Sequence, residues 1–501
     1  MPLPPARRHL GFALLLILVA LQHFFGAIMS ELSPDEAYYW DAGRHLALSY
    51  YHHPPLAPYL IRAATWLGGD SKLVLRSLAI GLSLTRLVLL YALATSLFGQ
   101  GVALASVVLL QLTPLFALGF LMQYDIPQLT LWALAAWSLY QALARRQGRW
   151  WYLSGAALGL GFLAKPSMVL FIPSAFLLLL LCRSQRHWLR RREPYLGLLL
   201  AALLCLPMAL WHWQHGGLES FGALQSSLAA RFSRPDPNSI TANLGEYLGV
   251  TPPLVFLAYL WGTVVLLWQG LKRQDLRYLL VACLALPTLL AGLAGLVWLQ
   301  DAGGNWPAQG YLTAAMAASA LLEKARHRVA AWGLVGGFAA LQTAALGWFI
   351  LSPSIPIPPD LQARIRAQMS LYAWEATARA VNAQLQALPS GTRLVAGDRF
   401  LASSLAFATT GQPHTTQIFA ERTNYFYYAD APLRPGDQVL LACFHPACAQ
   451  YGARQFRERQ VFDPVPIYWR GQLVQTLWLV YLVDYQCPRG TLRWDRQCHP
   501  S

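Results

Sequence analysis

The sequence predicts a polytopic α-helical membrane protein that carries a soluble α/β domain at its C-terminal end. Of the 501 residues, 56% are hydrophobic and only 12% are charged, whereas a soluble protein carries about 25% charged residues. Long windows without charged side chains recur up to residue 351, and a bilayer core of about 30 Å needs roughly 20 apolar residues in a helix. Beyond residue 351 the composition becomes that of a soluble domain.

These windows predict about eleven transmembrane helices within residues 1–351. One of them contains Arg76 and Arg86, and four are short enough to need flanking residues to span. We expect the first to be an uncleaved anchor, because no good small-x-small cleavage site precedes Glu31. The expected spans are 10–29, 73–98, 102–122, 126–144, 150–164, 166–182, 195–211, 247–271, 278–299, 306–322 and 329–351.

The distribution of basic residues predicts the orientation, because Lys and Arg are retained on the cytoplasmic side. With the N-terminus inside, the inner segments hold 16 basic residues (Lys and Arg) and three acidic ones. The outer segments before the tail hold six basic and ten acidic residues. The tail then lies outside. The net charge of +15 is explained by lipid-facing loops, so nucleic-acid binding is a poor interpretation.

The tail, residues 352–501, opens with the Pro-rich segment SPSIPIPPD. TRLVAG, FLASSLAFATT and TTQIFA predict a strand, a helix and a strand, and DQVLLAC predicts a further strand. We read QLVQTLWLVYLV as a buried strand rather than a twelfth span, since two glutamines interrupt it. Disulfides Cys443–Cys448 and Cys487–Cys498 are expected in an oxidising compartment, with free thiols as the alternative.

The loop between the first two spans, residues 30–72, is rich in chemistry. Asp35 and Glu36 lie just beyond the first span, where a lipid-carrier phosphate would reside. Adjacent carboxylates suit a general base and a partner that holds the acceptor or a divalent cation; the alternative is an acidic helix start at Pro34. PLAPYLIRAATWLG predicts a helix lying flat on the membrane. Several aromatic residues suit an interfacial belt, namely Tyr38, Tyr39, Trp40, Tyr50, Tyr51, Tyr59 and Trp66.

Four more polar residues stand near predicted outer boundaries. His52 and His53 precede two prolines that hold an extended backbone, so they could bind phosphate or a metal, or simply belong to the loop. Asp125 lies at the predicted outer end of a span, where a charged side chain is costly unless it is solvated, paired or part of a functional site. It could also be a helix N-cap. Lys165 is either a phosphate site or a snorkelling lysine. Arg86 lies mid-span and requires a buried partner.

The sequence lacks the common nucleotide and metalloprotease motifs. There is no Gly-x-x-x-x-Gly-Lys-Ser/Thr loop, no Gly-x-Gly-x-x-Gly after a strand and no His-Glu-x-x-His pair. Nucleotide chemistry is therefore a poor interpretation.

The stretch SPDEAYYWDAGRHLALSYYHHPPLAPYLIR resembles the bacterial branch of the dolichyl-phosphate-mannose protein mannosyltransferase superfamily (glycosyltransferase family 39/83-like), which includes the aminoarabinose lipid A transferases. MQYDIPQLTLWALAAW, GLGFLAKPSMVL, NWPAQGYL and DRFLASSLAFATTGQP are similar too. The resemblance implies a C-type glycosyltransferase fold in a bacterial inner membrane, a periplasmic tail, and a first outer loop that carries the catalytic acid.

The resemblance also implies roles for particular residues. Asp35, Glu36 and Asp125 are the expected catalytic residues, with Asp35 and Asp125 the candidate ligands of a divalent cation such as Mg²⁺ or Mn²⁺. Many relatives carry an acidic residue where this chain has His52, which puts metal dependence in question. The expected substrate and phosphate contacts are Arg44, His52, His53 and Lys165.

The expected reaction transfers a sugar, with inversion, from a polyprenyl-phosphate donor to an acceptor oxygen. The acceptor could be lipid A or lipopolysaccharide, another envelope glycan, a lipid or a protein, and the enzyme is expected to be a monomer among membrane lipids. A transporter or flippase of a lipid-linked glycan is the alternative, although transporters place coupling residues near the midplane. A non-catalytic receptor acting through its tail is a third class.

Overall fold

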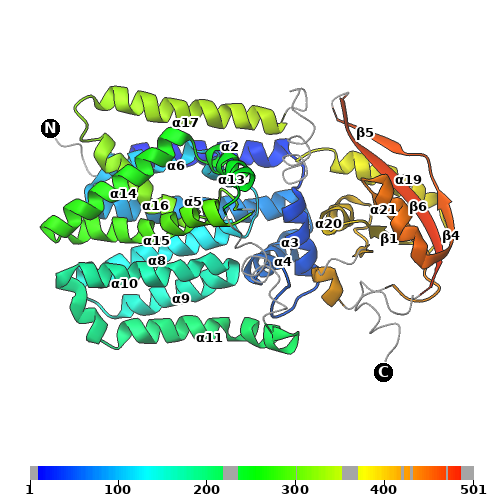
Figure 1. Ribbon diagram of the computed structural model, residues 1–501, viewed down its shortest axis with the longest axis horizontal. Coiled ribbons are helices and arrows are strands. Elements are labelled where there is room, and N and C mark those ends of the chain that lie inside the picture. The colour runs from blue at the N-terminus through cyan, green and yellow to red at the C-terminus, as the bar shows by residue number, and fades with distance from the viewer. Residues whose placement is uncertain are drawn as a thin grey trace. The chain divides into compact units, whose positions relative to one another are not determined.

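The computed structural model describes residues 9–217, 235–300, 302–351, 371–418, 423–428, 433–469 and 472–486. The chain divides into two compact units (Figure 1). The helical unit comprises Met1–Gly26, His53–Ala57 and Arg76–Gly347, and the mixed unit comprises Ala27–His52, Pro58–Leu75 and Trp348–Ser501. Most of the loop at 30–72, which we had expected to belong with the spans, therefore groups with the C-terminal residues.

The helical unit is built from apolar helices. Of the helices in the described part of the chain, five are long and apolar enough to cross a membrane, and the bent pair Pro166–Leu181 and Arg183–Arg190 makes a sixth if it is one span. The α-helices are α2 (Leu10–Met29), α5 (Lys72–Phe98), α6 (Gln100–Gln111), α7 (Pro114–Ala117), α8 (Asp125–Arg145), α9 (Arg149–Ala164), α10 (Phe171–Leu181), α11 (Glu193–Gln214), α13 (Pro237–Val250), α14 (Pro253–Arg273), α15 (Leu276–Trp298), α16 (Ala308–Leu322) and α17 (Arg328–Leu351).

Two predicted spans are wrong as single helices, and proline is the reason in both. Residues 102–122 contain a break at Thr113, whose extended backbone (φ −102°, ψ 140°) precedes Pro114. Residues 247–271 are divided between α13 and α14 at Thr251, which is extended before Pro252 and Pro253. A residue before proline is disfavoured in the helical region, so an apolar run alone does not guarantee a continuous helix.

Small residues bring two of these helices, α9 and α11, close together. The helices α8, α9 and α11 lie side by side (Figure 1). A Cβ atom on Gly155 of α9 would lie only 2.1 Å from the carbonyl oxygen of Gly197 on α11. Glycine at such crossings lets helix backbones approach closely, which is a common packing mode in membranes.

The mixed unit contains a six-stranded sheet in the order β2-β1-β3-β6-β4, with β5 paired to β6. β1 is parallel to β2 and β3, whereas β6 is antiparallel to β3, β4 and β5. The strands are β1 (Arg393–Ala396), β2 (Thr416–Gln417), β3 (Val439–Cys443), β4 (Phe456–Val461), β5 (Val465–Trp469) and β6 (Gln472–Tyr485).

The expected strand, helix and strand at the start of the tail are β1, α20 (Arg399–Ala408) and β2. The segment that could be mistaken for a further span is the strand β6, as predicted. Cys443 and Cys448 form a disulfide. The predicted Cys487–Cys498 disulfide and the Pro-rich segment at 352–360 lie outside the described residues.

Two helices of the outer loop complete the mixed unit, together with α19 (Trp374–Ala387). These are α3 (Pro34–Arg44), which packs against α20, and α4 (Leu56–Gly68). The predicted interfacial belt is wrong for Tyr38, Tyr39, Trp40 and Tyr50, which are all buried. The Trp40 ring instead packs edge-on against Phe407, 5.0 Å away between centroids. Aromatic rings suit an interface and a core equally well, so composition could not separate the two.

Candidate functional site

Two predicted site residues form a buried ion pair in the helical unit. Asp125 is the first residue of α8, and Lys165 joins α9 to a 3-10 turn that begins at Pro166. Because proline follows it, Lys165 has an extended backbone (φ −151°, ψ 129°). Its Nζ atom lies 2.6 Å from Asp125 Oδ1, and the two side chains are only 10% and 7% exposed.

The same cluster contains one further predicted residue and two that the prediction missed. Asn305 Nδ2 donates a hydrogen bond of 2.9 Å to Asp125 Oδ2. Tyr124 contacts two predicted site residues, with Lys165 Nζ 4.9 Å from its ring centroid and the His53 ring stacked on it at 4.6 Å. The only sequence signals for the missed pair were their positions in NWPAQGYL and MQYDIPQ.

These contacts define what the cluster can do chemically. A buried ion pair stabilises a protein only when hydrogen bonds satisfy both charges. Here both carboxylate oxygens of Asp125 accept a hydrogen bond. The Lys165 ammonium carries three N–H donors, of which the described contacts use one. The cluster therefore presents a positioned cation that can bind a phosphate oxygen, with Asp125 as the group that positions it.

The geometry corrects one expectation about Asp125 and adds a contact to it. Tyr124 occupies the N-cap position of α8 and makes no side-chain cap, so Asp125 is not the cap residue. The ammonium of Lys165 lies beside Oδ1 of Asp125, so this oxygen already has a cationic partner. Among the described residues no group of three or more His, Cys, Asp and Glu side chains could hold a metal ion.

In the mixed unit, the Asp35-Glu36 pair begins α3. Glu36 is fully buried, and its Oε2 accepts a 2.9 Å hydrogen bond from the backbone N–H of Ser33, whose Oγ in turn accepts from the Glu36 N–H. This is a capping box, in which the two groups satisfy each other's backbone donors. The helix-start reading thus applies to Glu36. Asp35 is half-buried in the first turn of the same helix.

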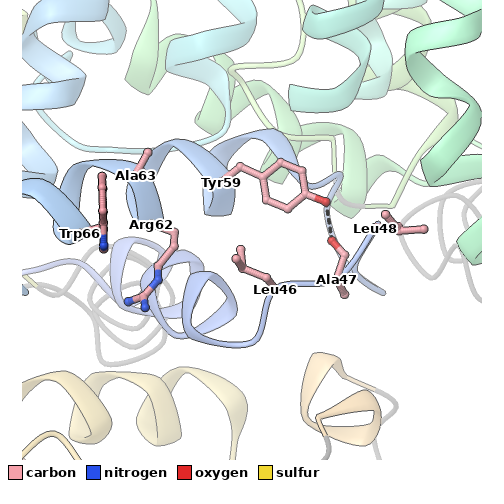
Figure 2. Close-up of a pocket in the computed structure, with 7 residues that line it drawn as sticks. All are labelled: Leu46, Ala47, Leu48, Tyr59, Arg62, Ala63 and Trp66. Atoms are coloured by element: carbon pink, nitrogen blue, oxygen red, sulfur yellow. Dashed lines mark hydrogen bonds between the residues drawn. The ribbon is translucent and has the colours of Figure 1, made fainter.

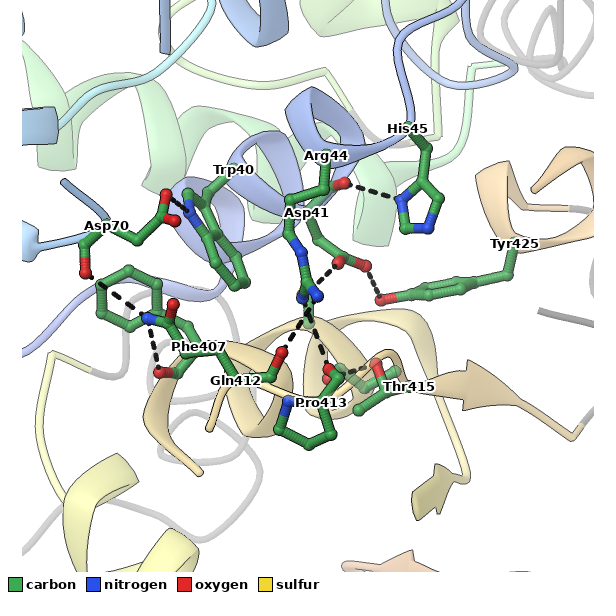
Figure 3. A network of polar contacts seen from close by, with 12 residues as sticks. Trp40, Asp41, Arg44, His45, Asp70, Phe407, Gln412, Pro413, Thr415 and Tyr425 are labelled. Atoms are coloured by element: carbon green, nitrogen blue, oxygen red, sulfur yellow. Dashed lines mark hydrogen bonds and ion pairs between the residues drawn. The ribbon is translucent and has the colours of Figure 1, made fainter. Parts of the chain in front are cut away.

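Arg44, an expected phosphate contact, is engaged by backbone carbonyl groups of the tail and by Asp41. Its guanidinium donates to the carbonyl oxygens of Gln412 at 2.9 Å and Pro413 at 3.4 Å, and lies 3.5 Å from Asp41 Oδ1 (Figure 3). Arg44 therefore ties α3 to the segment after α20.

Asp41 is a buried acid that the sequence analysis missed. Its Oδ2 accepts a 2.7 Å hydrogen bond from the hydroxyl of Tyr425 (Figure 3). Burial raises the pKa of Asp41, opposed by the nearby His45, Tyr425 and Arg44. The one available signal was a lone acid within the aromatic run AYYWDAGR.

The two adjacent histidines belong to different units. His52 Nδ1 lies 2.9 Å from the hydroxyl of Tyr38, and the backbone N–H of His52 donates to Asn424 Oδ1 at 3.3 Å. His53 stacks on Tyr124 in the helical unit. These contacts are with different partners, which agrees with the expectation that neighbouring residues do not face alike.

Arg86, the mid-span arginine, is 1% exposed and lies over the Phe116 ring at 5.1 Å. Its guanidinium nitrogens have no hydrogen-bond partner among the described residues. A cation over an aromatic face is a favourable arrangement when both are desolvated, so Phe116 is the buried partner that the sequence did not reveal.

The fold and the site together define a largely helical protein, with several helices long and apolar enough to cross a membrane, a buried lysine–carboxylate pair, and an outer loop that groups with an α/β sheet. Residues 52–211 match the sequence model of the dolichyl-phosphate-mannose-protein mannosyltransferase family. The predicted resemblance to this superfamily is therefore confirmed.

Individual relatives are similar over longer stretches. A lipid A galacturonosyltransferase of Rhizobium johnstonii is 27% identical over 299 residues, which cover 58% of this chain and 60% of that protein. An undecaprenyl phosphate-alpha-4-amino-4-deoxy-L-arabinose arabinosyl transferase of Sodalis glossinidius is 24% identical over 275 residues, covering 51% and 47%. The chain thus spans about half to three fifths of the length of these relatives.

The fold is shared with a solved structure over nearly its whole length. ArnT from Cupriavidus metallidurans, bound to undecaprenyl phosphate, superposes with a TM-score of 0.63 and 14% sequence identity, covering 94% of this chain and 98% of that one. At this identity the likeness concerns the fold alone.

Proposed function

We propose that this protein is a glycosyltransferase that moves a sugar from a polyprenyl-phosphate carrier to an envelope acceptor, with lipid A as the first acceptor to test. The observation that carries the proposal is the Lys165–Asp125–Asn305 cluster, a cation positioned in a buried polar site. Two relatives support it by name, one a lipid A galacturonosyltransferase and one a transferase of an undecaprenyl-phosphate-linked aminosugar.

The proposed topology follows from the charge distribution of the sequence. The chain crosses the inner membrane about eleven times as a monomer, with its N-terminus in the cytoplasm and the C-terminal α/β domain in the periplasm. This arrangement puts the start of α3 and the start of α8 on the outer side, because each follows an outward-running span in that topology.

The proposed chemistry is a single displacement with inversion. The acceptor oxygen attacks the anomeric carbon, the bond from that carbon to the carrier phosphate breaks, and polyprenyl phosphate leaves with its electron pair. Asp35 takes the acceptor proton as general base. Lys165 and His53 stabilise the negative charge that develops on the phosphate, which is the largest contribution in many such sites, and Asp125 and Asn305 hold Lys165 in place.

A divalent cation is not needed for any of these steps. Asp35 stays the proposed ligand if the reaction uses one, since Asp125 is already engaged by Lys165. Whether the reaction uses a divalent cation is measured by comparing the transfer rates of the wild type and Asp125→Asn after chelation, before and after Mn²⁺ is supplied.

Lipid mass spectrometry tests the proposal. Envelope lipids from cells with and without the protein should differ by the mass of one sugar, and the purified protein should transfer that sugar in detergent. Asp35→Asn, expressed at normal levels, should lose transfer, whereas Asp463→Asn, the same change at an exposed carboxylate in the turn between β4 and β5, should not. Wild-type rates in Asp35→Asn would remove Asp35 from the mechanism.

The same assay decides between an enzyme and a transporter. Transfer in detergent requires no sealed compartment, so activity there supports the enzyme. A protein that alters lipid distribution only in sealed vesicles, with no new covalent product, is a flippase instead.

A further inference from the structure

A cavity of about 690 Å³ opens in the mixed unit, apart from the residues discussed above. One wall is α4, which contributes Tyr59, Arg62 and Trp66, and the other is the segment after α3, which contributes Leu46 and Leu48 (Figure 2). Volumes of 300–1,000 Å³ are typical of sites that hold a small molecule. The cavity is therefore large enough for a ligand.

Hydrogen bonds and backbone packing fix the two walls relative to each other. The hydroxyl of Tyr59 donates to the carbonyl oxygen of Ala47 at 2.6 Å (Figure 2), and the hydroxyl of Tyr50 donates to that of Ala42 at 2.9 Å. A Cβ on Gly43 would lie 2.9 Å from the carbonyl oxygen of Pro58, so α3 and α4 touch at this point. The cavity is thus a built feature of the fold.

The walls of the cavity are apolar and exposed. Trp66 is 77% exposed, Leu46 61% and Leu48 47%, and the neighbouring Leu67 is 79% exposed. Contiguous exposed apolar side chains of this size mark binding or membrane-interaction sites. The chemistry of the walls favours an acyl chain.

Arg62 is the one charged residue among those that line the cavity. It is exposed, and among the described residues its guanidinium has no hydrogen-bond or ion-pair partner. It stands one helical turn before Trp66 on the same face of α4, since residues four apart are neighbours on a helix. A cation beside an apolar groove complements an amphiphile whose head is anionic.

The chain connections place this cavity next to the membrane. Only three residues separate the end of α4 at Gly68 from the start of α5 at Lys72, a distance of at most about 14 Å. The ammonium of Lys72 donates to the carbonyl oxygens of Ile28 and Ser30 at the end of α2. The cavity therefore lies close to the ends of two helices, α2 and α5, that are long and apolar enough to cross a membrane.

We propose that this cavity binds one diacyl phospholipid with an anionic headgroup, its phosphate on Arg62 and an acyl chain along Leu46, Leu48 and Trp66. A lipid from the surrounding membrane accounts for three features together: its acyl chain packs on the apolar walls, its phosphate pairs with the one cation, and its source lies beside the two spans. This binding site is independent of the sugar transfer proposed above, because it involves none of the residues assigned to that reaction.

Native mass spectrometry of the full-length protein in detergent tests the proposal, with dioleoyl phosphatidylglycerol as the probe and dioleoyl phosphatidylcholine as its zwitterionic counterpart. The wild type should saturate at one tightly held phosphatidylglycerol. Arg62→Gln should weaken that binding by about tenfold or more, the value of a charge-assisted hydrogen bond, and should weaken phosphatidylcholine binding less, because the choline cation of that lipid offsets the charge of its phosphate. Arg379→Gln, the same substitution at an exposed arginine on α19, should alter neither.

A second pair of variants tests the apolar walls. Trp66→Ala should weaken the binding of both lipids, whereas Trp66→Phe, which keeps an aromatic ring, should retain most of it. Comparing the two variants separates the loss of contacts from misfolding. Equal effects of Arg62→Gln and Arg379→Gln would overturn the proposal, as would equal wild-type affinity for the two lipids or a bound lipid that Trp66→Ala does not weaken. A protein without transferase activity that still binds one phosphatidylglycerol would refute only the proposed function.

Discussion

Replacing Lys165 by methionine removes one member of the buried ion pair and leaves the Asp125 carboxylate with the Asn305 amide. The two charged groups are 2.6 Å apart and no more than 10% exposed, and at an effective dielectric constant of about 20 their attraction is about 6 kcal/mol. The cost of desolvating both ions offsets much of this. Breaking such a pair by removing one partner nevertheless costs about 3–5 kcal/mol, because a buried charge is left without its counterion.

The double variant Lys165→Met/Asp125→Asn removes both charges and should recover most of the lost stability, since neutral replacements of a buried pair are often close to neutral overall. Thermal unfolding in detergent measures the wild type, Lys165→Met and the double variant. Lys272→Met is the matched control, the same substitution at an exposed lysine near the end of α14, and should leave the unfolding temperature unchanged.

Activity and stability should then separate. The double variant is expected to be folded but inactive, because the ammonium that binds the phosphate is gone. A double variant no more stable than Lys165→Met would show that the two side chains are not coupled. Wild-type transfer by Lys165→Met would show that the ammonium does not act on the phosphate.

Three further predictions follow from individual contacts. Asn305→Ala should destabilise the protein by about 1.5–3 kcal/mol, the value of a hydrogen bond to a charged group, and by less in the Asp125→Asn background; equal costs in both backgrounds would contradict the contact. Because burial raises the pKa of Asp41, its contribution to stability is complete below the ordinary carboxyl pKa of about 4 and is lost as the pH rises through the raised value. Asp41→Asn should therefore gain stability relative to the wild type as the pH rises from about 4 to 8, and a difference in unfolding temperature that is constant with pH would oppose this. Removing the Cys443–Cys448 disulfide, whose cysteines are five residues apart, should cost about 2 kcal/mol in the chain-entropy model, and a reducing agent should have no further effect on the Cys443→Ala/Cys448→Ala variant.

The candidate site shows how far sequence reasoning reached. Lys165 and Asp125 were recognised because a charge at a membrane boundary is costly and needs a reason. Asn305 was not, because it is neutral and 180 residues from Asp125 in the chain. The contacts of Arg44 were hidden for the same reason: its carbonyl partner at Gln412 is 368 residues away, so nothing near it in the sequence could show that contact.

What the sequence by itself determined is the class of the protein and its local elements. Apolar windows, the bias of basic residues and the strand–helix–strand pattern at the start of the tail depend on residues within one or two dozen positions of each other, which is the range over which helices and strands form. The two broken spans were predicted as continuous helices, although the prolines that break them stand in the sequence.

Only the tertiary structure decided which polar groups meet. It placed the outer loop with the C-terminal residues in one unit, buried Tyr38 and Trp40 where an interfacial position was expected, and paired Lys165 with Asp125. The physical reason is that burial and pairing energies depend on distances in space between segments that folding brings together from far apart, whereas hydropathy and periodicity are properties of a single segment.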